Sequence, residues 1–154
     1  MITSDGELKN ISLLKLEQPA ESQRVISAHT AQALRAMLEM VVLPGGTAPR
    51  AQVLGYRVAG KTGTAHKLDA QGTYAPNRYI ASFVGFAPAS DPRLIIAVMV
   101  DEPSAGQYYG GTVAAPVFSR IMTGALRMLA VSPDMPTQNM LLPPTDAPEV
   151  REET

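Results

Sequence analysis

At 154 residues, the chain is long enough for one domain or part of one, and folding would bury roughly two-thirds of its unfolded surface. Thirteen Lys and Arg residues against 14 Asp and Glu give a net charge of −1, which offers no reason to expect nucleic acid or an anionic membrane as partner. Cysteine is absent, and the two histidines, His29 and His66, lie far apart. These facts argue against a disulfide scaffold and a zinc site, so we expect no metal and no cofactor.

The first third of the chain predicts a short strand and then a helix. Asp5-Gly6 is typical of a turn, and residues 11–16 are an apolar run compatible with a strand. Ser27 is a candidate N-cap for a helix that ends before the Pro44-Gly45-Gly46 sequence. The apolar residues that recur at helical spacing are Ala31, Leu34, Leu38, Val41 and Val42.

The middle of the chain predicts three strands, at about residues 56–66, 80–87 and 94–100. The links between them are rich in turn residues, and the second link is too short for a crossover helix. Short links favour antiparallel pairing. After a glycine-rich loop at 106–111, Pro116 is expected to open a second helix. Its expected apolar face comprises Phe118, Ile121, Met122, Ala125, Leu126 and Leu129.

Composition divides the chain into two parts. Residues 1–131 carry the predicted elements and form the predicted domain, although we expect this domain to be only part of a larger one. Residues 132–154 contain repeated prolines and an acidic end, which predict a disordered C-terminal tail. The chain has no apolar run of about 18 residues and no signal peptide, so we expect any membrane anchor to lie outside it.

One short motif fits two different chemistries. Residues 55–62, from Gly55 to Thr62, match the phosphate-binding pattern GxxxxGK[ST], and the apolar run ending at Asp101 has the form of a magnesium-binding strand. A phosphate loop, however, requires a helix directly after Lys-Thr. Here Gly63 follows Thr62, and the residues beyond are poor helix formers. The context therefore disfavours nucleotide binding, which remains the alternative interpretation.

The second interpretation is acyl transfer. Lys61-Thr62-Gly63-Thr64 matches the Lys-Thr-Gly motif of the serine enzymes that penicillin inhibits. On an extended edge strand, Lys61 would supply positive charge, and the hydroxyls of Thr62 and Thr64 could bind a substrate carboxylate. Gly63 would let a substrate backbone approach closely, and the Thr64 N–H is suited to an oxyanion.

Around this motif the chain resembles the C-terminal half of the class B penicillin-binding proteins, over about residues 25–129, and most closely their septal, division-specific members from Gram-negative bacteria. Two segments carry the main resemblance, residues 58–65 and residues 79–88. Three shorter ones favour the septal type: Asp101-Glu102-Pro103, Tyr108-Tyr109-Gly110-Gly111 and Ala115-Pro116-Val117-Phe118.

The resemblance implies an α/β (α+β) transpeptidase domain with an antiparallel five-stranded sheet packed by helices, incomplete in this chain. It also implies a D,D-transpeptidase that cross-links peptidoglycan stem peptides, including those of the lipid-linked precursor, through a serine acyl-enzyme. β-Lactam antibiotics and cell-division proteins are the further partners that it implies, at the periplasmic face of the inner membrane. His66 is implied to tune recognition of the substrate carboxylate, and Tyr108 and Tyr109 to form an aromatic rim. Plain alternatives remain open: His66 as a solvent-facing strand residue, and the tyrosines as loop packing.

Two motifs of such enzymes are not met. The chain has no Ser-x-Asn, and its one Ser-x-x-Lys, starting at Ser12, has the sequence of a strand near a turn. A nucleophile belongs at the start of a buried helix well upstream of the Lys-Thr-Gly strand in this family, so we do not assign Ser12 this role. The chain is therefore expected to carry one wall of an active site and to be inactive alone. A non-catalytic interaction module is the other hypothesis that the sequence leaves open.

Overall fold

The structure is a computed structural model that describes residues 3, 5–9 and 22–135. The elements in chain order are β1 (Glu7–Lys9), β2 (Ser22–Arg24), α1 (Ala28–Met40), the 3-10 helix η1 (Pro49–Ala51), β3 (Ala59–Leu68), β4 (Tyr74–Ala87), β5 (Leu94–Asp101), α2 (Gly110–Val113) and α3 (Ala115–Met128). The predicted strand at 11–16 lies outside the described residues.

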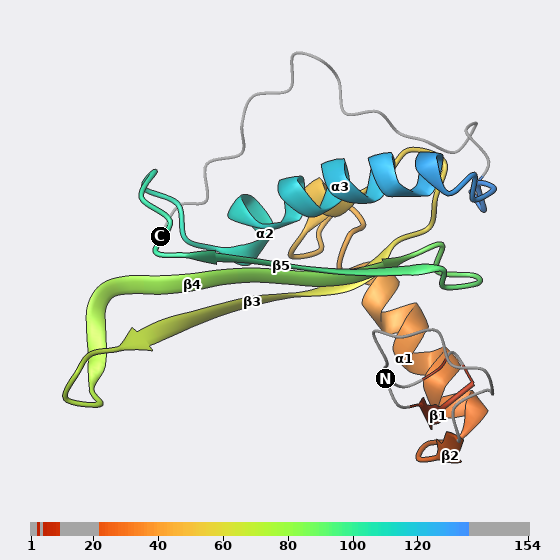
Figure 1. The fold of residues 1–154 in the computed structure, drawn as a ribbon, viewed down its shortest axis with the longest axis horizontal. Coiled ribbons are helices and arrows are strands. Elements are labelled where there is room, and N and C mark those ends of the chain that lie inside the picture. The colour runs from red at the N-terminus through yellow and green to blue at the C-terminus, as the bar shows by residue number, and fades with distance from the viewer. Residues whose placement is uncertain (1–2, 4, 10–21, 136–154) are drawn as a thin grey trace.

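The main sheet is antiparallel, with the strand order β3-β4-β5. This confirms the antiparallel pairing that the short links predicted. A separate small sheet pairs β1 with β2. In Figure 1, α2 and α3 lie along one face of the main sheet, and α1 extends from the opposite side at one end.

The three strands predicted in the middle of the chain are present, with shifted ends. β4 begins at Tyr74, six residues before the predicted start, and runs through Pro76 and Asn77. Asn77 adopts a positive φ of 58°, a conformation that asparagine tolerates, so the strand continues through residues that are typical of turns. The actual turn is at 69–73, where the Asp69 carboxylate accepts hydrogen bonds from the N–H groups of Gln71 and Thr73.

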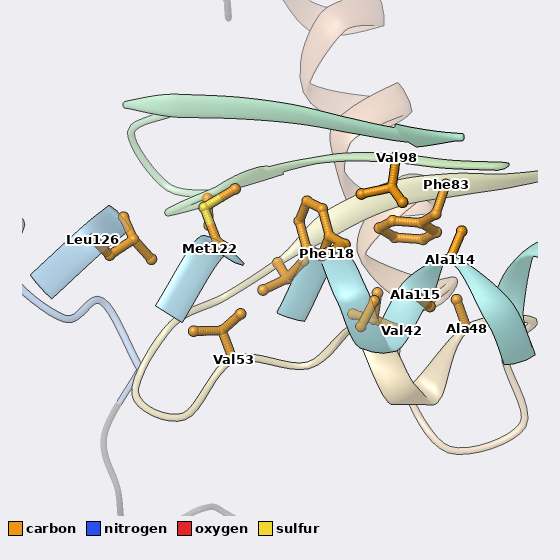
Figure 2. Close-up of a cluster of buried hydrophobic side chains, with 13 residues drawn as sticks. Val42, Ala48, Val53, Phe83, Val98, Ala114, Ala115, Phe118, Met122 and Leu126 are labelled. Atoms are coloured by element: carbon orange, nitrogen blue, oxygen red, sulfur yellow. The ribbon is translucent and has the colours of Figure 1, made fainter. Parts of the chain in front are cut away.

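The core lies between the sheet and α3. Phe83 of β4 and Phe118 of α3 meet edge to face, with ring centroids 4.8 Å apart. Figure 2 shows both rings within the buried cluster. Pro116 stands in the first turn of α3, as predicted. The buried residues of α3 are Ala115, Phe118, Met122 and Leu126. Two members of its predicted apolar face, Ile121 and Leu129, are instead exposed, because the face is wider than the contact with the sheet.

The residues that follow α1 supply the other side of this core. The buried core residues from that segment are Val42, Ala48, Ala51, Val53 and Val58.

The short helix α2 begins at Gly110, inside the segment predicted to be a loop. Close packing explains its two glycines: a Cβ at Gly110 would lie 2.1 Å from the Ser82 carbonyl oxygen, and one at Gly111 would lie 2.0 Å from that of Thr47.

Helix α1 forms where the sequence predicts it. The Ser27 hydroxyl accepts a hydrogen bond from the Thr30 N–H at 3.0 Å, which confirms the N-cap. No residue of α1 itself is buried, however, and Leu34, Met37 and Met40 are exposed by 46%, 61% and 64%. Helical periodicity thus predicted the helix, but the described residues bury its apolar face only in part.

The start of the predicted tail is attached to the body. The Asp134 carboxylate accepts hydrogen bonds from the Arg57 N–H at 2.7 Å and from the N–H and hydroxyl of Ser90 at 3.2 and 2.6 Å. The Met135 N–H donates to the Gly55 carbonyl at 3.1 Å. Asp134 thus satisfies several backbone and side-chain donors of the body at once. Residues 136–154 of the predicted tail lie outside the described residues.

Candidate active site

The Lys61-Thr62-Gly63-Thr64 motif lies in the middle of β3. Within the part of the chain that the structure describes, β3 pairs with a strand on one side only, where Lys61 lies opposite Val84 and Thr62 opposite Phe83. The other edge of β3 is open and can accept an extended chain. This confirms the predicted strand and places the motif on an edge.

Lys61 and Thr62 present their polar groups together. The exposed Lys61 Nζ lies 3.1 Å from the Thr62 carbonyl oxygen and 3.4 Å from Thr62 Oγ1. Thr62 Oγ1 in turn lies 3.2 Å from the hydroxyl of Thr47, which belongs to the loop after α1. An ammonium and two hydroxyls thus gather beside the strand, a set of donors suited to a carboxylate.

Thr64 and Gly63 connect β3 to its neighbours. Thr64 Oγ1 accepts a hydrogen bond from the Gly110 N–H at 3.2 Å, which ties the motif to the start of α2. Gly63 was expected to leave room for a substrate backbone. The structure gives it a packing reason as well: a Cβ there would lie 2.4 Å from Ser82 Oγ, whose hydroxyl donates to the Gly63 carbonyl at 3.3 Å.

Beyond Thr64, aromatic rings form a continuous row. The His66 ring lies 4.4 Å from the Tyr79 ring, the Tyr79 and Tyr108 rings stack at 4.1 Å with an interplanar angle of 12°, and Tyr108 and Tyr109 are 4.5 Å apart. The Tyr74 ring also meets the His66 ring, edge-on, with centroids 6.1 Å apart. His66 is exposed but lies against aromatic rings, so it is more than an isolated solvent-facing residue. We call His66, Tyr79, Tyr108 and Tyr109 the aromatic rim.

An ion-pair network lies next to this rim. Lys67 Nζ contacts Asp101 at 2.9 Å and Glu102 at 2.6 Å, and the Arg78 guanidinium also pairs with Glu102. Hydrogen bonds from Arg78 and Lys67 lower the pKa of the Glu102 carboxyl to about 2. The same contacts raise the pKa of Lys67, with the Glu102 hydrogen bond as the largest cause.

The geometry excludes the phosphate-loop interpretation. After Lys61 and Thr62 the chain continues as strand to Leu68, so no helix N-terminus follows the motif. Asp101 ends β5 and is paired with Lys67, rather than lying beside Lys61. Among the described residues there is no cluster of three or more potential metal ligands.

Sequence reasoning missed two residues of this site. Thr47 contacts the motif from a loop 15 residues upstream, a contact set by tertiary structure alone. Tyr79 could have been found from strand register, because it lies directly opposite His66 in the β3–β4 pair. Ser12 lies outside the described residues, so its position is not part of the site described here.

The comparison with protein families decides the assignment. The model described as "Penicillin binding protein transpeptidase domain" matches residues 1–123. The chain belongs to this family. It is 46% identical over 139 residues to "Probable peptidoglycan D,D-transpeptidase PenA" of Neisseria flavescens, covering 90% of this chain and 34% of that protein. It is 44% identical over 133 residues to "Peptidoglycan D,D-transpeptidase FtsI" of Escherichia coli K12, covering 86% of this chain and 22% of that protein.

A solved structure agrees with the fold. The transpeptidase domain of penicillin-binding protein 3 from Burkholderia pseudomallei, in its apo form, matches with a TM-score of 0.77 and 50% identity, over 86% of this chain and 40% of that one. The α/β fold and the penicillin-binding transpeptidase family that the sequence predicted are therefore confirmed. The chain spans only about a third or less of the curated relatives' length. No helix among the described residues is long and apolar enough to cross a membrane.

Proposed function

We propose that this chain forms one wall of the active site of a peptidoglycan D,D-transpeptidase. The supporting observation is the open edge of β3, where the Lys61 ammonium lies beside the Thr62 hydroxyl and Thr64 follows two residues later. A stem peptide would add to this edge as an extended strand. Its terminal carboxylate would lie near Lys61, Thr62 and Thr64, and the Thr64 N–H would help to stabilise the oxyanion.

The reaction proposed is acyl transfer through a serine. The serine hydroxyl attacks the carbonyl of the penultimate D-alanine, the terminal D-alanine leaves with a proton, and an amine of a second stem peptide then takes the acyl group from the serine. The chain has no Ser-x-Asn, and the proposal does not use its one Ser-x-x-Lys at Ser12, so in this proposal the serine is supplied from outside the chain. A β-lactam would acylate the same serine.

Within the penicillin-binding transpeptidases, we assign the chain to the septal, division-specific type. The likeness to a protein named FtsI supports this type of transpeptidase. The division proteins and lipid-linked precursor as partners, and the periplasmic face of the inner membrane as the location, are what the resemblance of the sequence implies. His66 and the aromatic rim would contact the part of the substrate next to the carboxylate.

A chimaera tests the proposal. Residues 25–131 would replace the matching segment of the Burkholderia pseudomallei transpeptidase domain, which supplies the missing serine. Incubation with benzylpenicillin should add one acyl mass by intact-protein mass spectrometry, and the same chimaera carrying Lys61→Ala should be acylated slowly. A folded chimaera that takes up no benzylpenicillin would contradict the catalytic assignment and favour an interaction module.

A further inference from the structure

The loop between β5 and α2, residues 103–109, carries two residues of the aromatic rim and begins directly after Glu102. Residues 104–107 of this loop are exposed, so the loop depends on its ends for its position. Glu102 itself adopts a positive φ of 49°. That conformation is unfavourable for a residue with a long side chain, and it persists only where other contacts enforce it.

Three contacts hold Glu102 against the neighbouring strands. Its N–H donates to the Tyr79 carbonyl of β4 at 2.9 Å. Its carboxylate accepts hydrogen bonds from Arg78 Nε at 3.0 Å and from Lys67 Nζ of β3 at 2.6 Å. Glu102 thus joins β3 and β4 at the point where the chain leaves β5.

The end of the loop returns to the same place. Tyr108 stacks on Tyr79, the residue whose carbonyl accepts the Glu102 N–H. Two residues later the Gly110 N–H donates to Thr64 Oγ1. Both ends of the loop are therefore fixed near Tyr79. Glu102 holds the beginning of the loop, and the stacking of Tyr108 on Tyr79 together with the Gly110–Thr64 hydrogen bond holds its end.

We propose that Glu102 is a positioning residue for the aromatic rim: its carboxylate, held by Arg78 and Lys67, fixes the start of the 103–109 loop so that Tyr108 stacks on Tyr79 beside the Lys61 strand. The view that this rim faces substrate rests on the proposed function. The positioning itself does not, and it can be measured without any acylation.

The neighbouring acid provides a matched control. Asp101 also pairs with Lys67, but it belongs to β5 and lies opposite Ile80 in the strand ladder, which fixes its position independently of the ion pair. Loss of the Asp101 charge should leave the loop unchanged, whereas loss of the Glu102 charge removes the ion pairs with Lys67 and Arg78 that help to enforce its backbone conformation.

The test is an NMR comparison of the 154-residue chain with its Glu102→Gln and Asp101→Asn variants. In Glu102→Gln, the ring-current shifts of Tyr79 and Tyr108 should move towards random-coil values. Amide exchange at 104–109 should become roughly 2- to 30-fold faster, the range for two lost ion pairs. The signals of Phe83 and Phe118 in the core should not move. Asp101→Asn should match the unmodified chain throughout.

Screening by salt gives a second measurement that needs no folded variant. Raising ionic strength to about 1 M shortens the Debye length to about 3 Å, which should weaken the Tyr79–Tyr108 ring-current shifts in the unmodified chain. The proposal is wrong if the ring-current shifts of Tyr79 and Tyr108 stay the same in high salt. It is also wrong if they stay the same in a folded Glu102→Gln chain, because the backbone alone would then position the loop. Equal effects of Asp101→Asn and Glu102→Gln would also overturn it.

Discussion

The two faces of the β3–β4–β5 sheet differ in what covers them. On one face, Phe83 and Val98 pack under α3 and are buried. On the other, which carries Lys61, the side chains of Val84 and Met99 are exposed by 47% and 72%. The first face therefore supplies the stability of the described body, while the second leaves apolar and charged groups accessible. Substitutions of Phe118 under the first face and of Lys61 on the second should separate stability from activity.

Phe118→Ala should have the largest effect on stability. The ring is fully buried and meets Phe83 in the centre of the core, so its removal leaves a cavity between α3 and the sheet. We expect a loss of about 3–5 kcal/mol in the free energy of unfolding. Urea denaturation followed by circular dichroism measures it. A loss below about 1 kcal/mol would mean that α3 contributes little to the fold.

Lys61→Ala should slow acylation and leave the stability of the fold almost unchanged. Removing one charged group from the site is expected to slow acylation of the chimaera by benzylpenicillin about 10²–10³-fold. Because Lys61 is exposed, the free energy of unfolding should change by no more than about 0.5 kcal/mol. Stopped-flow acylation and thermal melts on the same samples give both values. Normal acylation by a folded variant would remove Lys61 from the proposed mechanism.

Thr64→Val should have an intermediate effect. The substitution keeps the shape but deletes the acceptor of the Gly110 N–H, and Gly110 is buried. An unsatisfied buried N–H costs about 1–3 kcal/mol, which should appear in the free energy of unfolding. Thr64→Ser retains the hydroxyl and serves as the control. Equal stability of the Val and Ser variants would show that the Gly110 contact is dispensable.

Acid should release the aromatic rim only at very low pH. The pKa of Glu102 is lowered from 4.5 to about 2, so its pairing contributes stability above pH 4.5 that is lost as the pH falls through about 2. Ring-current shifts of Tyr108 should stay constant from pH 7 to pH 4.5 and then decline as the pH approaches 2. The same acid titration of the Glu102→Gln variant should show no such decline in the Tyr108 shifts. A decline that begins near pH 6 would point to a different titrating group.

Met99→Ser should have the smallest effect. Met99 is largely exposed on the Lys61 face, so the free energy of unfolding of the isolated chain should change by no more than about 0.5 kcal/mol. Val98→Ser, one residue away on the buried face, provides the contrast and should be clearly destabilising. A large loss in Met99→Ser would show that the Lys61 face is covered in solution.

The sequence alone predicted the larger helices and the strands of the main sheet, and it favoured acyl transfer as the chemistry of the Lys61 motif. Helical spacing and Ser27 predicted α1, and short links rich in turn residues predicted the antiparallel strands. Strand context around Lys61 was enough to prefer acyl transfer over a phosphate loop, because a phosphate loop needs a following helix that these residues disfavour.

The tertiary structure decided which residues meet. Thr47 reaches Thr62 from another loop, Tyr108 stacks on Tyr79 across two segments, and Asp134 binds Arg57 and Ser90 from the predicted tail. No local pattern encodes such contacts, because propensity and periodicity report only on neighbours within a few residues. Burial follows the same rule: α1 and α3 both have apolar faces, but α3 contributes buried residues to the core, whereas none of the residues of α1 is buried by the described part of the chain.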